Sequence, residues 1–217
     1  MLDGDDFGNV LYMIDIGQND ITNTFINSSI FHVLQQIPTF IYEIKDAIKT
    51  LYKLGRRKFW VYNTGPASCL PRMLTTNKVE DHRVDFGETS CVKPLSEVVQ
   101  DFNAQLQNLC QDLRVELKNA TMVYVDMYTI KCELISNFTL YGFENPLKAC
   151  CGGNGASYHA NPILWCGESK FTMCRDDTRD INWDGVHYTD NANKVFAARI
   201  AITNYSMPAL TFEYVLC

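Results

Sequence analysis

Apolar residues in this chain recur with a helical period over two long segments. Residues 30–54 place apolar side chains every three or four positions and are followed by Gly55, a common helix stop. Pro38 lies inside this segment and is expected to kink or split the helix. Residues 94–118 repeat the same spacing and predict a second amphipathic helix.

Short apolar runs separate the helical segments and predict buried strands. These runs cover residues 9–16, 58–62 and 121–126, and shorter helices are expected at 127–136 and 189–204. Strands that alternate with helices predict an α/β fold, in which a parallel sheet carries helices on both faces. In such sheets the chemistry is found at the carboxyl ends of the strands.

Two segments carry no clear period and are expected to be loops. Residues 63–93 contain glycine, proline and two cysteines, and residues 138–183 are rich in cysteine. The carboxyl ends of two predicted strands carry polar groups, namely the run 17–20 and Asp126.

Composition indicates a soluble globular chain that forms a single domain over residues 1–217. Hydrophobic residues make up 47% and charged residues 20% of the 217 residues, which is enough apolar material for a sizeable core. The net charge is −6 and no long basic run occurs, so nucleic acids and anionic membrane surfaces are not expected partners. No apolar stretch reaches the roughly 18 residues that a transmembrane helix needs.

Nine cysteines leave two interpretations open, a zinc site or a set of disulfides. Five of them lie between Cys132 and Cys174. A zinc site favours C-x2-C or H-x3–5-H spacing, and neither spacing occurs here. Disulfides formed in an oxidising compartment are therefore favoured, and no metal site is predicted.

Four glycosylation sequons support a secreted protein, although one or two are expected by chance. Their asparagines are Asn27, Asn119, Asn137 and Asn204. The first six residues are acidic and lack the basic start and apolar run of a signal peptide. The odd number of cysteines agrees with a partner upstream, so we expect the chain to be incomplete at its N-terminus.

Two short motifs are candidates for catalytic chemistry. Asp184 precedes His187 by three residues in a glycine-containing turn, a spacing that can hold a carboxylate against an imidazole. Alone, this pair is more typical of a surface loop with an incidental histidine. Gly17 and Asn19 follow a buried strand, where an amide can donate to an oxyanion, although an Asx-turn has the same pattern.

Taken together, these motifs resemble the plant branch of the GDSL esterase/lipase family, and within it the early-nodulin-like and fucosidase-like members. The resemblance covers about residues 9–205. Besides the two motifs, it rests on residues 63–66, 69–71, Cys91, Phe102, Asn103, Leu106, 125–128, 150–153, Cys166, Gly167 and Cys174.

The resemblance implies a three-layer α/β/α sandwich similar to flavodoxin and a metal-free, cofactor-free hydrolysis of carboxylic esters. It implies that His187 is the general base, that Asp184 orients it, that Asn19 donates to the oxyanion and that Gly17 shapes the oxyanion loop. The substrate would be a small-molecule or lipid ester. The full-length protein would be secreted, with Cys69 expected to pair with Cys91 and the cysteines of residues 150–174 expected to pair among themselves.

The nucleophile of the family is missing from this sequence. Its Gly-Asp-Ser block follows a first strand, and no such block occurs here. Residues 167–169 resemble the block but lack a preceding apolar strand, and Ser68 lies in a loop beside a cysteine. The chain alone is therefore expected to be nearly inactive. The alternatives are a non-catalytic pseudoenzyme remnant or glycoprotein interaction module and, more remotely, a metal-dependent hydrolase.

The missing block also predicts an exposed sheet edge. If the N-terminal strands of the family fold are absent, the strand at 9–16 presents an unpaired apolar edge, which favours association. We expect the isolated chain to aggregate. A monomeric sedimentation peak together with a cooperative melt would contradict this prediction.

The remaining histidines and two aromatic residues complete the candidates. His32, His82 and His159 have no metal-ligand spacing and are expected to be structural or surface residues. Trp183 and Tyr188 flank His187, where they either line a substrate cleft or wedge the loop against the last helix.

Overall fold

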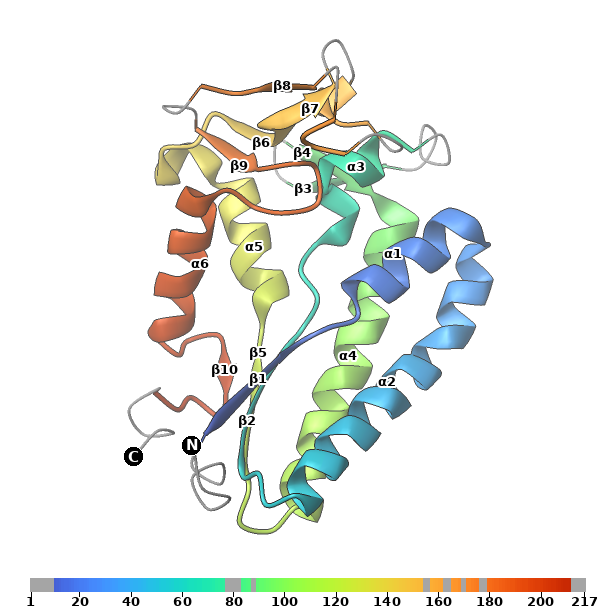
Figure 1. Ribbon diagram of the computed structural model, residues 1–217, viewed down its shortest axis with the longest axis vertical. Helices are drawn as coiled ribbons and strands as arrows, with labels where there is room; N and C mark the ends of the chain where they lie inside the picture. The colour runs from blue at the N-terminus through green and yellow to red at the C-terminus, as the bar shows by residue number, and fades with distance from the viewer. Residues whose placement is uncertain are drawn as a thin grey trace. The chain divides into compact units, whose positions relative to one another are not determined.

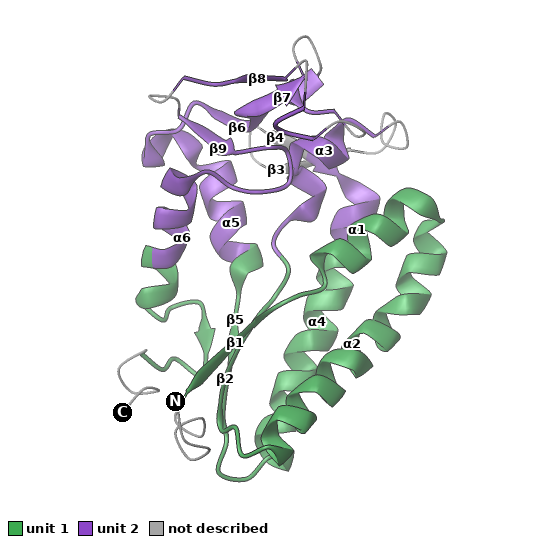
Figure 2. Ribbon diagram, in the orientation of Figure 1, with its two compact units in different colours: residues 1–64, 98–128, 198–217 green, residues 65–97, 129–197 purple. Residues whose placement is uncertain are grey.

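A computed structural model describes most of the chain. The described residues are 10–76, 83–86, 89–153, 157–161, 165–168, 171–175 and 179–211. They divide into two units, shown in Figure 2 in green and purple. Unit 1 comprises residues 1–64, 98–128 and 198–217, and unit 2 comprises residues 65–97 and 129–197.

Unit 1 contains a four-stranded sheet in the order β1-β2-β5-β10. Strands β1 (Leu11–Asp15), β2 (Lys58–Tyr62) and β5 (Thr121–Val125) are parallel, as the alternation of strands and helices predicted. The short strand β10 (Ser206–Met207) pairs antiparallel with β5, so one strand that was not predicted is added to the predicted parallel sheet and the whole sheet is mixed. Strand β10 supplies hydrogen bonds to the far edge of β5, whose backbone groups would otherwise need other partners.

The central strands are buried and β1 is not. Four of the five residues of both β2 and β5 are buried, as expected for continuous apolar runs covered on both faces. Strand β1 pairs only with β2 among the described residues, and Met13 within it is 56% exposed. This agrees with the predicted exposed edge, while the association behaviour stays a prediction.

Two long helices pack beside each other in unit 1, as Figure 1 shows. Helix α2 (Ile30–Lys53) begins at Ser29, whose side chain accepts a hydrogen bond from the backbone N–H of His32, and it continues through Pro38 without being split. An ion pair between Lys49 and Glu116 joins α2 to α4 (Lys93–Glu116). Both helices were predicted to within two residues.

Helix α1 (Gln18–Asn27) was not predicted. Most of its residues are polar, and only Ile21 and Phe25, which lie one turn apart, are buried. The sequence therefore shows no repeated helical spacing of apolar residues. The helix starts after Gly17, whose φ of 112° lies in the left-handed region. A Cβ at Gly17 would lie 2.5 Å from Phe102 Cζ, so this position needs glycine for two reasons.

Replacement of Gly17 by alanine is expected to lower the free energy of unfolding by about 2–4 kcal/mol, because backbone strain and overpacking add. Gly55→Ala is a matched control, since Gly55 also has a positive φ but no atom within 4 Å of its Cβ position. That variant should lose only about 1 kcal/mol. Urea denaturation measures both, and equal losses would show that Phe102 moves aside without cost.

Side-chain amides tie the carboxyl ends of the parallel strands together. Asn63, directly after β2, donates to Asp126 Oδ1 (2.9 Å) and to the Tyr124 hydroxyl (2.7 Å). Asn103 of α4 exchanges two hydrogen bonds with the Thr64 backbone, at 2.8 and 2.9 Å. These contacts give a structural reason for several positions on which the family resemblance rests.

Unit 2 is built mainly from short elements. The segments 63–93 and 138–183 were predicted as loops, but both contain short helices and strands. The first contains η2 (Ala67–Cys69), α3 (Pro71–Leu74) and a hairpin of β3 (Arg83–Phe86) and β4 (Thr89–Val92). The second contains η3 (Phe138–Tyr141), β6 (Asn145–Ala149), β7 (Cys151–Gly153), η4 (Ser157–His159), β8 (Phe171–Met173) and β9 (Asp180–Asn182).

Short strands of three to five residues are too brief to show a period, so their pairing comes from tertiary contacts. Strands β6 and β9 are parallel, and β7 and β8 are antiparallel. Helices α5 (Met127–Ser136) and α6 (Asp190–Ala201) lie close to their predicted ranges. No helix within the described ranges has the length and apolar character that crossing a bilayer requires.

Three disulfides hold these short elements. Cys69 pairs with Cys91, Cys150 with Cys174, and Cys151 with Cys166, which confirms the expected pairing. Among the described residues, Cys110 is a buried free thiol. The disulfides close loops of 22, 24 and 15 residues in a part of the chain with little regular structure.

Candidate functional site

The loop between β9 and α6 brings Asp184 and His187 together. Asp184 Oδ2 lies 2.7 Å from His187 Nδ1. The other carboxylate oxygen, Oδ1, accepts the backbone N–H groups of Val186 (3.0 Å) and His187 (2.8 Å). The backbone N–H of Trp183 donates to the His187 carbonyl at 2.7 Å and closes the loop. The carboxylate is therefore fixed at three points and holds the imidazole through Nδ1.

Exposure differs sharply between the two side chains. The Asp184 side chain is 13% exposed, whereas that of His187 is 68% exposed. His187 Nε2 has no hydrogen-bond partner within the described part of the chain. A carboxylate on Nδ1 stabilises an imidazolium and fixes the tautomer in which Nε2 accepts a proton. The pair thus has the geometry of a general base and its orienting group.

The hydrogen bonds to Asp184 keep its carboxyl acidic. Burial raises the pKa of Asp184, but hydrogen bonds from His187 and Val186 outweigh burial and hold the pKa below its ordinary value. A lowered pKa in the folded state stabilises the protein above the unfolded-state pKa of about 3.9. This contribution is lost as the pH falls through the folded-state pKa.

Asp184→Asn should therefore destabilise the protein most near pH 6, and its deficit in unfolding free energy should shrink as the pH is lowered below 4. Urea denaturation at pH 6, 4 and 3 measures the difference. Asp190→Asn is the control, because Asp190 forms an exposed pair with Lys194 that contributes little at any pH. A deficit for Asp184→Asn that did not change with pH would contradict this assignment.

Asp184 and His187 are called the dyad below, and the loop between β9 and α6 that carries them is the dyad loop. Arg72 is a neighbour of the dyad, and the sequence did not predict this contact. Its backbone N–H donates to the Gly185 carbonyl at 3.1 Å, and its guanidinium lies 3.8 Å from the centre of the Trp165 ring. Burial lowers the pKa of Arg72, and the Asp184 carboxylate opposes this change. The only sequence signal is its place after the proline of residues 69–71.

Gly17 and Asn19 belong to unit 1, whereas the dyad belongs to unit 2. Gly17 is buried and its carbonyl accepts the N–H of Ile21 at 3.0 Å. Asn19 is exposed in the first turn of α1, and its side-chain amide makes no hydrogen bond within the described residues. The first N–H groups of a helix lack intrahelical partners and favour negative charge. Gly17 and Asn19 thus lie at the start of α1, where backbone N–H groups are available as hydrogen-bond donors.

Ser68, His32 and His159, which were rejected on sequence grounds, form no hydrogen bond to His187 within the described residues. Ser68 is fully buried and accepts a hydrogen bond from the Ser96 hydroxyl at 2.7 Å. His32 is exposed on α2, and both ring nitrogens of His159 are bonded, to the Ala149 carbonyl and to Thr172. Ser169 and His82 lie outside the described residues.

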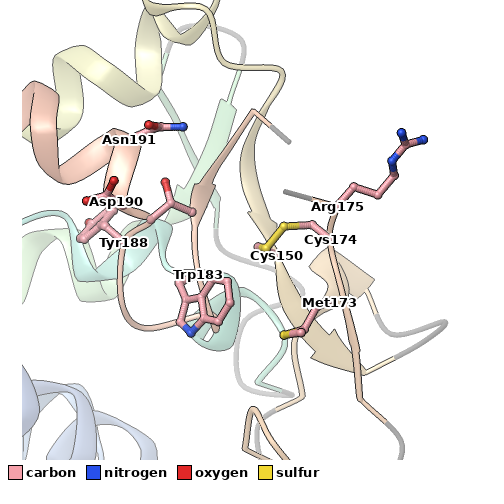
Figure 3. Close-up of a pocket in the computed structure, with 9 residues that line it drawn as sticks. Cys150, Met173, Cys174, Arg175, Trp183, Tyr188, Asp190 and Asn191 are labelled. Carbon is pink, nitrogen blue, oxygen red and sulfur yellow. A yellow bond between two sulfur atoms is a disulfide. The ribbon is translucent and has the colours of Figure 1, made fainter. Parts of the chain in front are cut away.

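A pocket of about 520 Å³ opens beside the dyad loop in unit 2 (Figure 3). Trp183 and Tyr188, the two flanking aromatic residues, both line it. Tyr188 also packs edge-on against Phe196 of α6, with ring centroids 5.0 Å apart. Tyr188 therefore packs the loop against the last helix, while the lining of a substrate cleft by these residues stays a prediction. The other lining residues are Cys150, Met173, Cys174, Arg175, Thr189, Asp190 and Asn191.

One group of potential metal ligands occurs among the described residues, namely Cys150, Cys174 and Asp180. The two sulfurs are joined in a disulfide, so neither is a thiolate able to bind a metal. The prediction that no metal is used stays a prediction. The four sequon asparagines, Asn27, Asn119, Asn137 and Asn204, are all exposed, which glycosylation requires.

Comparison with known proteins decides the family. Residues 2–200 match the GDSL-like Lipase/Acylhydrolase family. This chain belongs to that family. The α/β fold and the resemblance predicted from sequence are thereby confirmed.

Relatives of this GDSL family chain come from Arabidopsis thaliana. The chain is 46% identical over 209 residues to GDSL esterase/lipase At1g09390 and 42% identical over 209 residues to GDSL esterase/lipase LIP-4, with 96% of the chain covered in each case. It is 36% identical over 209 residues to Alpha-L-fucosidase 3, with 92% of the chain covered. The chain spans 55% of the length of each of these three relatives.

Proposed function

We propose that this chain carries the general base and the oxyanion donors of a carboxylic ester hydrolase, and that the nucleophilic serine belongs to the part of such a protein that this chain does not match. The Asp184–His187 pair carries the proposal, because its 2.7 Å contact leaves Nε2 exposed and able to accept a proton.

In the proposed reaction, His187 Nε2 removes the proton of the serine hydroxyl while the serine oxygen attacks the ester carbonyl. Asp184 stabilises the imidazolium that forms. The Asn19 amide and the backbone N–H of Gly17 donate to the carbonyl oxygen as it becomes negative. His187 then returns the proton to the leaving alcohol, and water hydrolyses the acyl-serine by the same sequence. The reaction uses no metal and no cofactor.

The proposal also covers the substrate class, the secretion and the glycosylation of the enzyme. Residues 1–217 form part of one catalytic domain, which acts on small-molecule or lipid esters in a protein that is secreted and glycosylated at Asn27, Asn119, Asn137 and Asn204. Three disulfides and the exposure of the four asparagines support an oxidising compartment. The alternative is a non-catalytic remnant or glycoprotein interaction module, which the unpartnered Nε2 of His187 also fits.

Labelling with a fluorophosphonate probe tests the proposal. The chain, expressed in a secretory host, should give no adduct by intact mass. A chimera that joins the chain to the unmatched part of the At1g09390 relative should give a stoichiometric adduct, which His187→Ala removes. A folded chimera without an adduct would favour the non-catalytic alternative. An adduct on a serine of the chain itself would overturn the assignment of the nucleophile.

A further inference from the structure

We propose that the pocket beside the dyad loop binds a pyranose ring, so that the ester substrate is an acylated carbohydrate. This inference rests on the proposed function, because it names the alcohol part of the substrate. The volume of about 520 Å³ falls within the range of about 300–1,000 Å³ that is typical of small-molecule sites.

One side of the pocket is apolar and presents an aromatic face. Trp183 is 38% exposed although it is one of the largest apolar side chains. Figure 3 shows its indole facing the pocket, with the Met173 side chain and the Cys150–Cys174 disulfide across from it. A partly exposed indole that lines a cavity offers a flat, apolar surface to the C–H face of a sugar ring.

The other side carries hydrogen-bonding groups from the start of α6. Asp190 is an exposed carboxylate that pairs with Lys194 at 2.7 Å and keeps acceptor capacity, since a carboxylate has about four acceptor sites. The Asn191 amide makes no hydrogen bond within the described residues and offers two donors and an acceptor. Thr189 is already used, because its hydroxyl donates to the Asp180 carbonyl and accepts from the Ala192 N–H.

This lining favours a carbohydrate over a fatty acyl chain or an anion. A methylene chain laid on Asp190 and Asn191 would remove water from both groups without replacing its hydrogen bonds, which is unfavourable. Sugar hydroxyls replace those bonds while the ring covers the indole. An anion would meet the Asp190 carboxylate, and the Arg175 guanidinium extends away from the other lining side chains in Figure 3.

The pocket and the catalytic imidazole share one short loop. The Trp183 backbone N–H donates to the His187 carbonyl at 2.7 Å, and Tyr188, also in the lining, follows His187 directly. Asn182 and Tyr188 form a β-bridge that closes the base of this loop. A sugar held on Trp183 is therefore bound by the same loop that presents the general base.

Side-chain indole N–H signals test the proposal in the ¹⁵N-labelled chimera described above, because the isolated chain is expected to aggregate. The chain has three tryptophans, and Trp183→Phe assigns the Trp183 signal. Methyl β-D-glucopyranoside should shift this signal with saturation and a Kd on the order of 1–10 mM, as expected for one small neutral ligand. Glycerol and methyl butyrate at the same concentrations should leave the signal unshifted.

Two variants and a matched control complete the experiment. Asn191→Ala, an exposed position that should not affect folding, is expected to weaken glucoside binding about 5–10-fold through the loss of one or two hydrogen bonds. Measured through the saturation-transfer difference of the glucoside signals, binding should be abolished by Trp183→Ala and unchanged by Trp165→Ala, which removes the exposed tryptophan outside the pocket.

Three results would overturn the proposal. These are a saturable shift with methyl butyrate only, equal shifts with glycerol, and no shift with any probe. A saturable glucoside shift that Asn191→Ala leaves unchanged would place the sugar elsewhere and equally overturn it. Fluorophosphonate labelling does not depend on this pocket. Absence of glucoside binding in a chimera that is still labelled would reject the carbohydrate alone, while glucoside binding in a folded chimera that is not labelled would reject the proposed ester hydrolase.

Discussion

His187→Ala in the chimera described above is expected to lower kcat for p-nitrophenyl acetate by about 10⁴–10⁶-fold, because the serine then has no base to accept its proton. Asp184→Ala should cost less, since the imidazole remains and loses only its orientation and the stabilisation of its charge. In both variants KM should change little, because neither side chain is expected to bind the ground-state ester.

A matched histidine distinguishes catalysis from a general effect of the substitution. His32 is exposed near the start of α2, and its imidazole makes no hydrogen bond in the described part of the chain. His32→Ala should leave kcat and KM at wild-type values. Wild-type turnover in His187→Ala would reject the general base, and wild-type turnover in Asp184→Ala would reject the orienting role.

Asn19→Ala is expected to lower kcat by about 10²–10³-fold, the usual cost of removing one oxyanion donor. The amide is exposed and unbonded in the described residues, so its removal should not affect folding. The loss should appear in kcat and kcat/KM equally, because the oxyanion forms only in the transition state.

Asn23 provides the control on the same helix. It is also exposed and lies about one turn further along α1. Asn23→Ala should leave turnover unchanged. Undiminished turnover in Asn19→Ala would remove this residue from the mechanism. An increase in KM with unchanged kcat would assign the residue to substrate binding instead.

Long elements of this fold were predictable because each carries its own period. Residues 58–62 form β2 as predicted, and the two 24-residue helices begin and end within two residues of the expected positions. A helix of this length repeats the spacing of its buried apolar residues over several turns, so the pattern is recognisable despite an exception such as Pro38. Helix α1 was missed because its buried face consists of two residues.

Contacts between candidate site residues were predictable where the two residues are close in sequence. Asp184 and His187 are three residues apart, and a glycine-containing turn leaves few ways to separate them. The contacts of Arg72 with Gly185 and Trp165 join segments that are far apart in the chain, so no local pattern indicates them. The same is true of the pocket, which combines the β8 segment with the start of α6.

The sequence by itself therefore determined the α/β class, the long helices, the three parallel strands, the family and the contact between Asp184 and His187. These features depend on periods and motifs that act over a few residues. Only the tertiary structure decided the mixed sheet, the strands of unit 2, the partners of Arg72 and the pocket on Trp183. Their stabilising contacts come from segments that are distant in the chain. Three disulfides hold the short elements of unit 2 together, so these segments do not need the regular spacing of apolar residues that a sequence pattern would reveal.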